Sequence, residues 1–329
     1  MARIVLGMDI GGTKSHAVLA DDTGKILGEG VGGSGNINFI PLDLAERSFA
    51  EAIGQAQDQA GISTLETEIA VIGIEPQVEP LHPCLKRLAG PKRIVRKEEG
   101  ECSLVGGLVE KVGLAMIAGT GSVGWGRNAQ GRTHVTSCWG PIGDEGSAYY
   151  LAVRGINAAF RADDGRGPKT KMVERIMQKI GGRTLRECVT PLYTSQDFRR
   201  EVSQYCKIVM DLATGNPPDG PMRQIVDEGA EEIAHFLATC AEVLGLHQAP
   251  YKVVAGSLTI KVPYYWQQVE TRLQKRHPQT KLVVPRFSPG VGAVLIALDM
   301  IGVPWSKPVI DQVEKTCRKE TGPDVRRDS

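Results

Sequence analysis

The sequence predicts an α/β protein built from two related halves. An apolar strand, a glycine-rich turn and a second strand occur near the start, in "IVLGMDIGGTKSHAVLA". The same pattern returns about one domain length later, in "GLAMIAGTGSVGWGR". Helix-like stretches alternate with short apolar strands, and the length of 329 residues is typical of two domains. We therefore expect one unit used twice, with the two halves facing each other.

In the first half, the pattern predicts a three-stranded meander followed by alternating helices and strands. Turn residues 21–24 separate the second apolar stretch from the third. Residues 41–61 are expected to form a helix that Pro41 opens and Gly61 closes. Its apolar side chains recur at helical spacing, at Leu42, Ala45, Phe49, Ile53 and Ala56. A short buried strand is expected over 68–74, and 92–108 is expected to be a strand that enters a helix.

The second half is predicted to be more helical. After its strand–turn–strand pattern, helix periodicity covers residues 144–160, 172–180 and 221–246. A late strand and glycine turn at 251–258 precede a final apolar helix at 290–301. These elements predict an N-terminal lobe at 1–115, a C-terminal lobe at 116–305 and a polar tail at 306–329, in which a short helix is an alternative. The final helix is able to pack back on the N-terminal lobe.

Composition and charge exclude several classes of function. With 41% hydrophobic residues, 23% charged residues and a net charge of +1, the chain has no electrostatic reason to bind nucleic acid or an acidic membrane. No apolar run approaches the ~20 residues of a membrane helix, and the first residues lack a signal-peptide cleavage pattern. Seven scattered cysteines without CxxC pairs argue against disulfides, zinc or an iron–sulfur cluster. We therefore expect a cytoplasmic protein.

Two common nucleotide motifs are nearly matched but fail on their context. "GMDIGGTK" has the glycine spacing of a P-loop, but Thr13 precedes Lys14, whereas that loop needs Lys before Ser or Thr. Residues 30–35 and 119–124 both spell GxGxxG. A dinucleotide site also needs a helix that opens at those glycines, and here strand and turn residues follow. An NAD site is therefore not expected.

A strand–glycine turn–strand pattern can instead hold phosphates. Without Cβ atoms in the way, successive backbone N–H groups can converge on phosphate oxygens, and Thr13, Lys14, Thr120 and Ser122 add side-chain donors. Asp9, at the end of the first strand, makes sense beside phosphates if Mg²⁺ lies between them. The alternative is that each turn merely closes a hairpin. Two matched turns together with an acidic strand end favour the phosphate interpretation.

Several segments of the chain resemble those of the N-acetylglucosamine kinase and BadF/BadG/BcrA/BcrD-type ATPase family and occur in the same order. This family has the actin-like, ribonuclease-H-like fold. The two glycine turns are similar to its first and second phosphate segments. "WGPIGDEGSAYYLA" is close to its "GDEGS" signature, "VVAGSL" to its adenosine segment and "GVGAVLIAL" to its closing helix. The resemblance covers residues 4–298. It implies two ribonuclease-H-like lobes around a central cleft that binds ATP and Mg²⁺, with a sugar deeper inside.

The resemblance also implies a set of site residues. The nucleotide-binding positions are Gly11, Gly12, Thr13, Lys14, Gly119, Thr120, Gly121, Ser122, Gly256 and Ser257. The sugar-binding positions are Asn36, Trp139, Gly140 and Asp144, and Asp9 holds the Mg²⁺. Two alternatives stay open: Asp144 as the N-cap of the helix that follows it, and Trp139 as a core residue between the lobes.

The chain departs from the family at the catalytic base. The family has an Asp before a helix that reads D-A-x-x-A-L-x-G, and Glu99 occupies that position here, with Glu98 and Glu101 beside it. A carboxylate is what the chemistry requires, since it accepts the proton of the attacking sugar hydroxyl. The extra methylene moves the acceptor by ~1 Å. The alternative for "KEEGE" is a solvated charged turn. The segment between Trp139 and Asp144 is also one residue shorter than the resemblance predicts.

The implied function is that of an ATP-dependent kinase for a hexose or amino sugar, foremost N-acetylglucosamine or glucosamine. Two alternatives remain. A nucleotide-driven activator ATPase would hold an iron–sulfur cluster through cysteines, but Cys102 and Cys138 lack the surroundings of that motif. A non-catalytic sugar or nucleotide sensor would account for the missing Asp and the short loop. The small-molecule sugar itself is not fixed by the sequence, and a homodimer is expected by resemblance alone.

Overall fold

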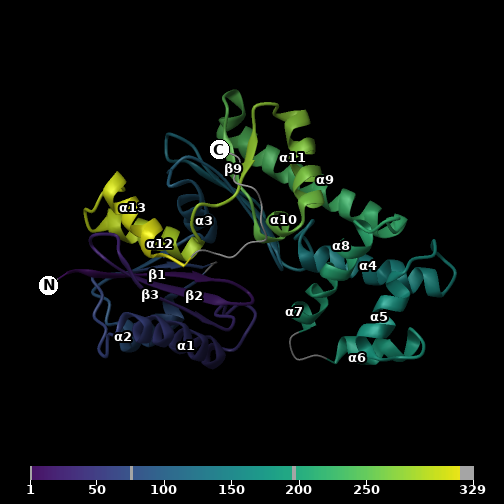
Figure 1. The fold of residues 1–329 in the computed structure, drawn as a ribbon, viewed down its shortest axis with the longest axis horizontal. Helices are drawn as coiled ribbons and strands as arrows, with labels where there is room; N and C mark the ends of the chain where they lie inside the picture. Colours follow the sequence, from purple (N-terminus) through teal and green to yellow (C-terminus); the bar gives the residue numbers. More distant parts are fainter. Residues whose placement is uncertain (1, 75–76, 195–197, 319–329) are drawn as a thin grey trace. The chain divides into compact units, whose positions relative to one another are not determined.

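The computed structural model describes residues 2–74, 77–194 and 198–318 (Figure 1). The chain divides into two compact units. The first combines the chain up to Ala115 with the segment that starts at Val283, and the second extends from Met116 to Leu282. Among the described helices, none has both the length and the apolar character needed to cross a bilayer.

A five-stranded sheet forms the centre of the first unit, in the order β3-β2-β1-β4-β5. Its strands are β1 (Ile4–Ile10), β2 (Ser15–Asp21), β3 (Ile26–Gly32), β4 (Ile69–Gly73) and β5 (Ile94–Lys97). β1, β2 and β3 are antiparallel neighbours, which confirms the predicted meander. The turn before β3 is closed by Asp21, whose Oδ1 accepts a hydrogen bond from the Thr23 backbone N–H at 2.9 Å. β4 and β5 run parallel to β1.

Helices cover both faces of this sheet (Figure 1). One face carries α1 (Leu42–Ala60) and α2 (His82–Ala89), and a short 3₁₀ helix (Glu79–Leu81) leads into α2. The other face carries α3 (Glu99–Leu108), α12 (Pro289–Met300) and α13 (Lys307–Thr316). The predicted helix at 41–61 is confirmed, and Gly61 ends it in the left-handed conformation. Each face of the sheet thus has its own apolar core.

Alternate glycines of β3 allow α1 to lie directly on the sheet. A Cβ built on Gly28, Gly30 or Gly32 would lie 2.0–2.1 Å from a carbonyl oxygen of α1. The atoms met in this way are the carbonyl oxygens of Ala56, Ala52 and Ser48. Helix packing therefore explains part of the glycine run that mimics a dinucleotide motif.

The boundary expected at residue 305 differs from the structure, which assigns the described residues 283–318 to the first unit. The reason is the packing of α12 on β1. A Cβ on Gly7 would lie 2.5 Å from the Val294 backbone nitrogen, so the helix and the strand are in backbone contact. The segment expected as a polar tail contains α13, whose Ile310 and Val313 are buried in the same core.

A second five-stranded sheet forms the centre of the second unit, in the order β10-β9-β6-β7-β8. Its strands are β6 (Gly113–Ala118), β7 (Ser122–Arg127), β8 (Thr133–Ser137), β9 (Lys252–Val254) and β10 (Lys281–Val283). Read from β8, the order repeats that of the first sheet from β3. The internal repeat that the glycine turns predicted is therefore confirmed at the level of topology.

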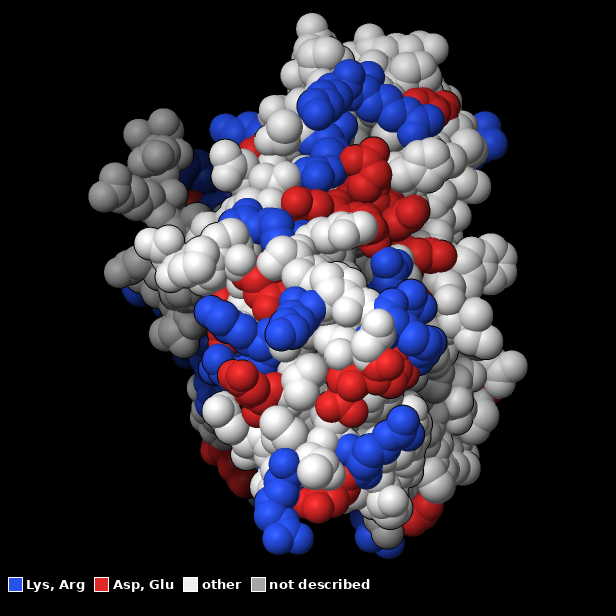
Figure 2. Space-filling model, turned by 90° about the vertical axis from the view of Figure 1, so that its right-hand side faces the viewer, with Lys and Arg blue, Asp and Glu red and all other residues white. Residues whose placement is uncertain are grey.

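The second unit is the more helical one, as expected. Its helices are α4 (Ala148–Asp163), α5 (Met172–Ile180), α6 (Val189–Tyr193), α7 (Phe198–Ser203), α8 (Tyr205–Ala213), α9 (Gly220–Leu244), α10 (Ser257–Lys261) and α11 (Pro263–Arg276), with 3₁₀ turns at Arg186–Cys188 and Leu246–Gln248. The long α9 packs on β7 and β8. On the face drawn in Figure 2, Lys and Arg alternate with Asp and Glu, in keeping with the net charge of +1.

The α1–β3 contact predicts opposite effects for two glycine substitutions. Gly30→Ala should lower the free energy of unfolding by about 2 kcal/mol, because the new methyl group meets the α1 backbone. Gly54→Ala, within α1, should raise it by about 0.5–1 kcal/mol, because its Cβ meets no described atom within 4 Å. Urea unfolding of both variants measures the difference. Equal stabilities would contradict the packing described here.

Candidate active site

The carboxyl ends of three parallel strands place charged residues at one edge of the first sheet. Asp9 near the end of β1 is in register with Gly73 of β4, which is in register with Lys97 at the end of β5. Carboxyl ends of parallel strands are the usual place for ligand sites in α/β folds. Because Gly73 carries no side chain, this edge offers a carboxylate and an ammonium group on either side of bare backbone.

The segment "KEEGE" begins α3 at this same edge. Glu99 is the first helical residue, and Glu101 Oε1 is 3.0 Å from Lys97 Nζ. The side chain of Glu101 is only 14% exposed, so the segment is not the solvated turn that was the alternative. Burial raises the pKa of the Cys102 thiol, and the charges of Asp9, Glu101 and Glu99 raise it further. A Cβ on Gly73 would lie 3.0 Å from Cys102 Sγ, so the helix that begins with Glu99 packs at the same strand end as Asp9.

The first glycine turn joins β1 to β2. The Gly11 N–H donates to the Lys14 carbonyl at 2.9 Å, which makes the turn a closed hairpin. The same turn has an open outer side: no described atom lies within 4 Å of a Cβ built on Gly12, and Lys14 is exposed. The turn can therefore close a hairpin and still offer its open outer side to a phosphate.

Asn36 is buried in the loop that follows β3. Its Oδ1 accepts hydrogen bonds from the backbone N–H and the side-chain Nδ2 of Asn38, at 3.0 and 2.8 Å. Gly35 packs so closely that its Cβ would lie 2.5 Å from Ser15 Oγ. The carbonyl of the Asn36 amide therefore fixes its own loop beside β2.

The second glycine turn joins β6 to β7. The Gly119 N–H donates to the Gly121 carbonyl at 2.9 Å, and the Ala148 N–H at the start of α4 donates to the Gly119 carbonyl at 2.8 Å. Ser122 is fully buried, and its hydroxyl donates to the Glu145 carbonyl at 2.7 Å. The hydroxyl of Ser122 thus faces inward, unlike the phosphate donor expected from the sequence. Thr120 is half-buried and carries the hydroxyl of this turn.

The segment expected at the adenosine lies against the second glycine turn. Gly256 approaches β6 so closely that its Cβ would lie 2.4 Å from the Ala118 backbone nitrogen. The Ser257 hydroxyl donates to the Ala118 carbonyl at 3.3 Å, next to Gly119. The fold therefore brings together two segments that lie more than 130 residues apart in the sequence.

The loop before α4 carries the predicted sugar contacts. Ser147, not Asp144, caps the helix: its Oγ accepts from the Tyr150 N–H at 3.2 Å. Asp144 is 5% exposed, and its Oδ1 accepts from the Gly140 N–H at 3.0 Å. Trp139 is 81% exposed and so does not belong to the core of its own unit. The helix-cap alternative for Asp144 is therefore wrong, whereas the alternative that places Trp139 between the lobes stays a prediction.

Sequence reasoning missed the partner of that carboxylate. Arg199 of α7 donates from Nη2 to Asp144 Oδ2 at 2.9 Å. Burial raises the pKa of Asp144, whereas the guanidinium and the backbone N–H groups of Gly140 and Trp139 oppose this shift. A Cβ on Gly121 would lie 2.7 Å from the same Oδ2. The two charges are 55 positions apart in the sequence, a separation that carries no spacing signal, so only the fold reveals the pair.

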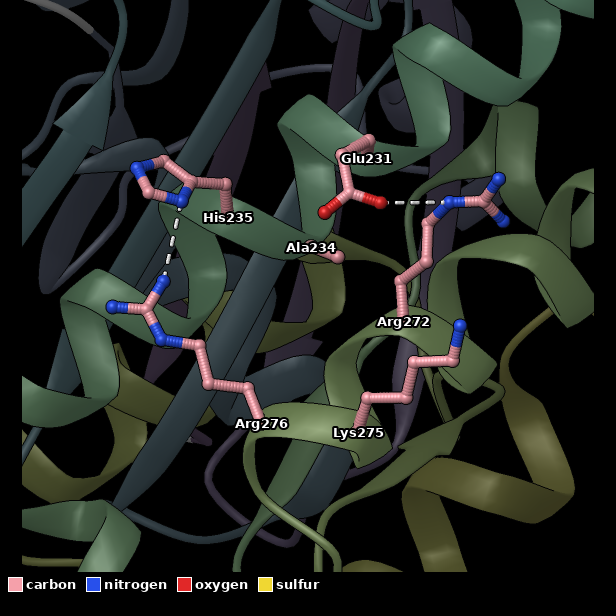
Figure 3. Close-up of a pocket in the computed structure, with 6 residues that line it drawn as sticks. All are labelled: Glu231, Ala234, His235, Arg272, Lys275 and Arg276. Atoms are coloured by element: carbon pink, nitrogen blue, oxygen red, sulfur yellow. Dashed lines mark hydrogen bonds and ion pairs between the residues drawn. The ribbon is translucent and has the colours of Figure 1, made fainter.

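A separate cavity of about 360 Å³ lies between α9 and α11 (Figure 3). It is lined by Glu231, Ala234, His235, Arg272, Lys275 and Arg276, none of which is a predicted site residue. Arg272 is paired with Glu231 at 2.9 Å, and Arg276 with Glu242 at 2.8 Å. Carboxylates thus balance both arginines, and Lys275 adds a further positive charge to the lining.

Comparisons with known proteins agree with this architecture. The N-acetylmuramic acid/N-acetylglucosamine kinase of Clostridium acetobutylicum is 27% identical over 304 residues, 90% of this chain and 98% of the relative. The glucosamine kinase of Vibrio cholerae is 30% identical over 177 residues, 52% of this chain and 60% of the relative. A Chromobacterium violaceum structure described as a candidate N-acetylglucosamine kinase superposes with a TM-score of 0.74 at 19% identity, covering 89% of this chain and 98% of that chain.

The structural likeness confirms the predicted fold class, an α/β protein of the actin-like ATPase type. The profile of the BadF/BadG/BcrA/BcrD ATPase family matches residues 6–297, which include both glycine turns and the loop before α4. This chain is therefore a member of the BadF/BadG/BcrA/BcrD ATPase family.

Proposed function

We propose that this protein is an ATP-dependent kinase that transfers the γ-phosphate to a hydroxyl of an amino sugar, foremost N-acetylglucosamine or glucosamine. The observation that carries the proposal is the placement of Asp9 and Glu99 at one carboxyl edge, beside the first glycine turn. A phosphoryl transfer needs a metal-binding carboxylate and a proton acceptor near the phosphates. Relatives described as kinases of N-acetylglucosamine, N-acetylmuramic acid and glucosamine support this choice of substrate class.

The nucleotide would be held by both glycine turns. Backbone N–H groups of residues 11–14 and 119–121 would bind the phosphates, with Thr13, Lys14 and Thr120 as side-chain donors. Ser122 would contribute its backbone only, since its hydroxyl is buried. Gly256 and Ser257 would approach the adenosine. The carboxylate of Asp9 is a suitable Mg²⁺ ligand, and the bound ion would neutralise part of the phosphate charge.

The sugar would be bound by an acceptor, a donor and an aromatic ring. Asp144 would accept from sugar hydroxyls, Asn36 would donate through Nδ2, and the Gly140 backbone would border the ring. The exposed indole of Trp139 offers a flat apolar face to the C–H groups of a sugar. The same proposal includes a cytoplasmic location and the homodimer that the family resemblance implies.

Glu99 is the best candidate for the base among the three neighbouring glutamates. Glu101 is held by Lys97 at 3.0 and 3.2 Å, an ion pair that fixes this carboxylate in place. Glu99 would accept the proton of the sugar hydroxyl as its oxygen attacks the γ-phosphate. Most of the acceleration would come from positioning and charge stabilisation.

No specific observation favours the other two functions. An activator ATPase that holds an iron–sulfur cluster between subunits needs accessible thiolates; of the two cysteines weighed for this role, Cys138 is exposed but Cys102 is fully buried in the core of the first unit. A non-catalytic sensor would bind nucleotide and sugar without forming ADP, so a turnover measurement separates it from a kinase.

Replacement of the proposed base tests this function. Glu99→Gln should lower sugar-dependent ADP release about 100-fold or more, because the amide accepts no proton, while nucleotide affinity stays unchanged. Glu101→Gln is the matched control and should lose far less activity. A Glu99→Gln variant with full activity would contradict the assignment of the base. Wild-type protein that forms no ADP with any amino sugar would contradict the kinase itself.

The thiol of Cys138 provides a reporter for the sugar loop. Cys138 is exposed and adjacent to Trp139, whereas Cys102 is fully buried with its pKa raised. Iodoacetamide should therefore alkylate Cys138 in the folded protein and leave Cys102 intact until the protein unfolds. A bound amino sugar should slow the alkylation of Cys138 at least threefold, as peptide mass spectrometry would show. An unchanged rate at a sugar concentration that saturates turnover would argue against this loop as the sugar site.

A further inference from the structure

Arg199 and Asp144 form a partly buried ion pair in the second unit. Arg199 Nη2 lies 2.9 Å from Asp144 Oδ2, and the side chains of Arg199 and Asp144 are 20% and 6% exposed. The second oxygen of Asp144 accepts the Gly140 N–H at 3.0 Å. The carboxylate is therefore fixed from two sides, by the guanidinium of α7 and by the backbone of its own loop.

This pair also touches the second glycine turn. A Cβ on Gly121 would lie 2.7 Å from Asp144 Oδ2 and 3.1 Å from Arg199 Nη2. The backbone of the turn therefore packs directly on both charged groups. A carboxylate at this place carries a full negative charge beside the proposed phosphate site. At low exposure, water and salt screen such a charge poorly. Without compensation, it would repel the nucleotide that the turn is built to hold.

We propose that Arg199 is a positioning residue that neutralises Asp144 beside the phosphate turn and fixes its carboxylate as an acceptor for the sugar. The inference rests on the proposed function, since the ligands are a nucleoside triphosphate and a sugar. Because the Arg199 guanidinium balances its charge, the Asp144 carboxylate can accept hydrogen bonds from the sugar without weakening the binding of the phosphates.

Neutralising Asp144 together with Arg199 separates this role from a purely structural one. If Arg199 acts by compensating charge, its loss matters because Asp144 stays negative, and removal of that charge should restore phosphate binding. If Arg199 only holds the fold together, a second substitution at Asp144 removes a further contact and makes binding worse. The double variant therefore distinguishes the two roles.

The experiment compares Arg199→Met, Asp144→Asn and the double variant by calorimetric titration with a non-hydrolysable ATP analogue and Mg²⁺. Arg199→Met should weaken binding of the analogue about tenfold or more. The double variant should recover to within about threefold of the wild type. Adenosine, which has no phosphates, is the control ligand, and its affinity should stay unchanged in all variants. A double variant that binds no better than Arg199→Met, or an equal loss for adenosine, would overturn the proposal.

Arg199→Lys keeps the test decisive if Arg199→Met does not fold. Lysine retains the positive charge but not the planar fork of the guanidinium. The affinity for the ATP analogue should therefore stay within about threefold of the wild type, while the KM for the sugar rises about fivefold or more at nearly constant kcat. A tenfold loss of analogue affinity in Arg199→Lys would contradict charge compensation.

Failure of this inference is distinguishable from failure of the kinase assignment. Binding of the analogue requires no turnover, so a wild-type protein that binds it but phosphorylates no sugar refutes the kinase and leaves the Arg199 test intact. An active kinase whose variants lack the expected pattern refutes the role of Arg199 alone.

Discussion

The parallel alignment of β1, β4 and β5 is the constraint on which the candidate site of the first unit depends. It brings the ends of three strands that are distant in the sequence to one edge, and the register sets Asp9, Gly73 and Lys97 side by side. The start of α3 is fixed by α12, because a Cβ on Gly292 would lie 2.0 Å from the Cys102 carbonyl oxygen. The helix α12, the last one in the region that the family profile matches, thus helps to position Glu99, although the two are far apart in the sequence.

The second unit has the same strand order as the first, but different charged residues lie near its glycine turn. Its glycine turn lies at the corresponding place, between its first two strands, but the neighbouring acid is Asp144 from the loop before α4. There the charge is balanced by Arg199, whereas in the first unit Glu101 is balanced by Lys97. Each unit therefore combines a bare backbone turn with one paired carboxylate. The proposed chemistry assigns metal binding to Asp9 and proton transfer to Glu99, both in the first unit.

Much of the fold could be predicted because its signals are local. Apolar strands, turn residues and helix caps depend on near neighbours, and the expected helix at 172–180 matches α5 (Met172–Ile180). The same holds for the turns that contain Gly11 and Gly119, since a glycine-rich stretch between two strands has few other uses. Asp144 was placed in the site by resemblance, although its helix-cap alternative failed because Ser147 takes that position.

What could not be predicted depends on contacts between distant segments. Arg199 has no local signal, because its partner lies 55 residues away on another element. The inward turn of the Ser122 hydroxyl depends on the Glu145 carbonyl, and the membership of α12 in the first unit depends on its contact with Gly7. In each case the sequence gives the chemical group, and the tertiary packing decides where that group points.

The most direct test of the account is product analysis by mass spectrometry after incubation with Mg²⁺, ATP and an equimolar mixture of N-acetylglucosamine, glucosamine, N-acetylmuramic acid and glucose. The account predicts that one amino sugar gains a phosphate in step with the ADP formed, with little reaction of glucose. ADP formed without any phosphorylated sugar, or no ADP despite nucleotide binding, would contradict the kinase that the geometry supports.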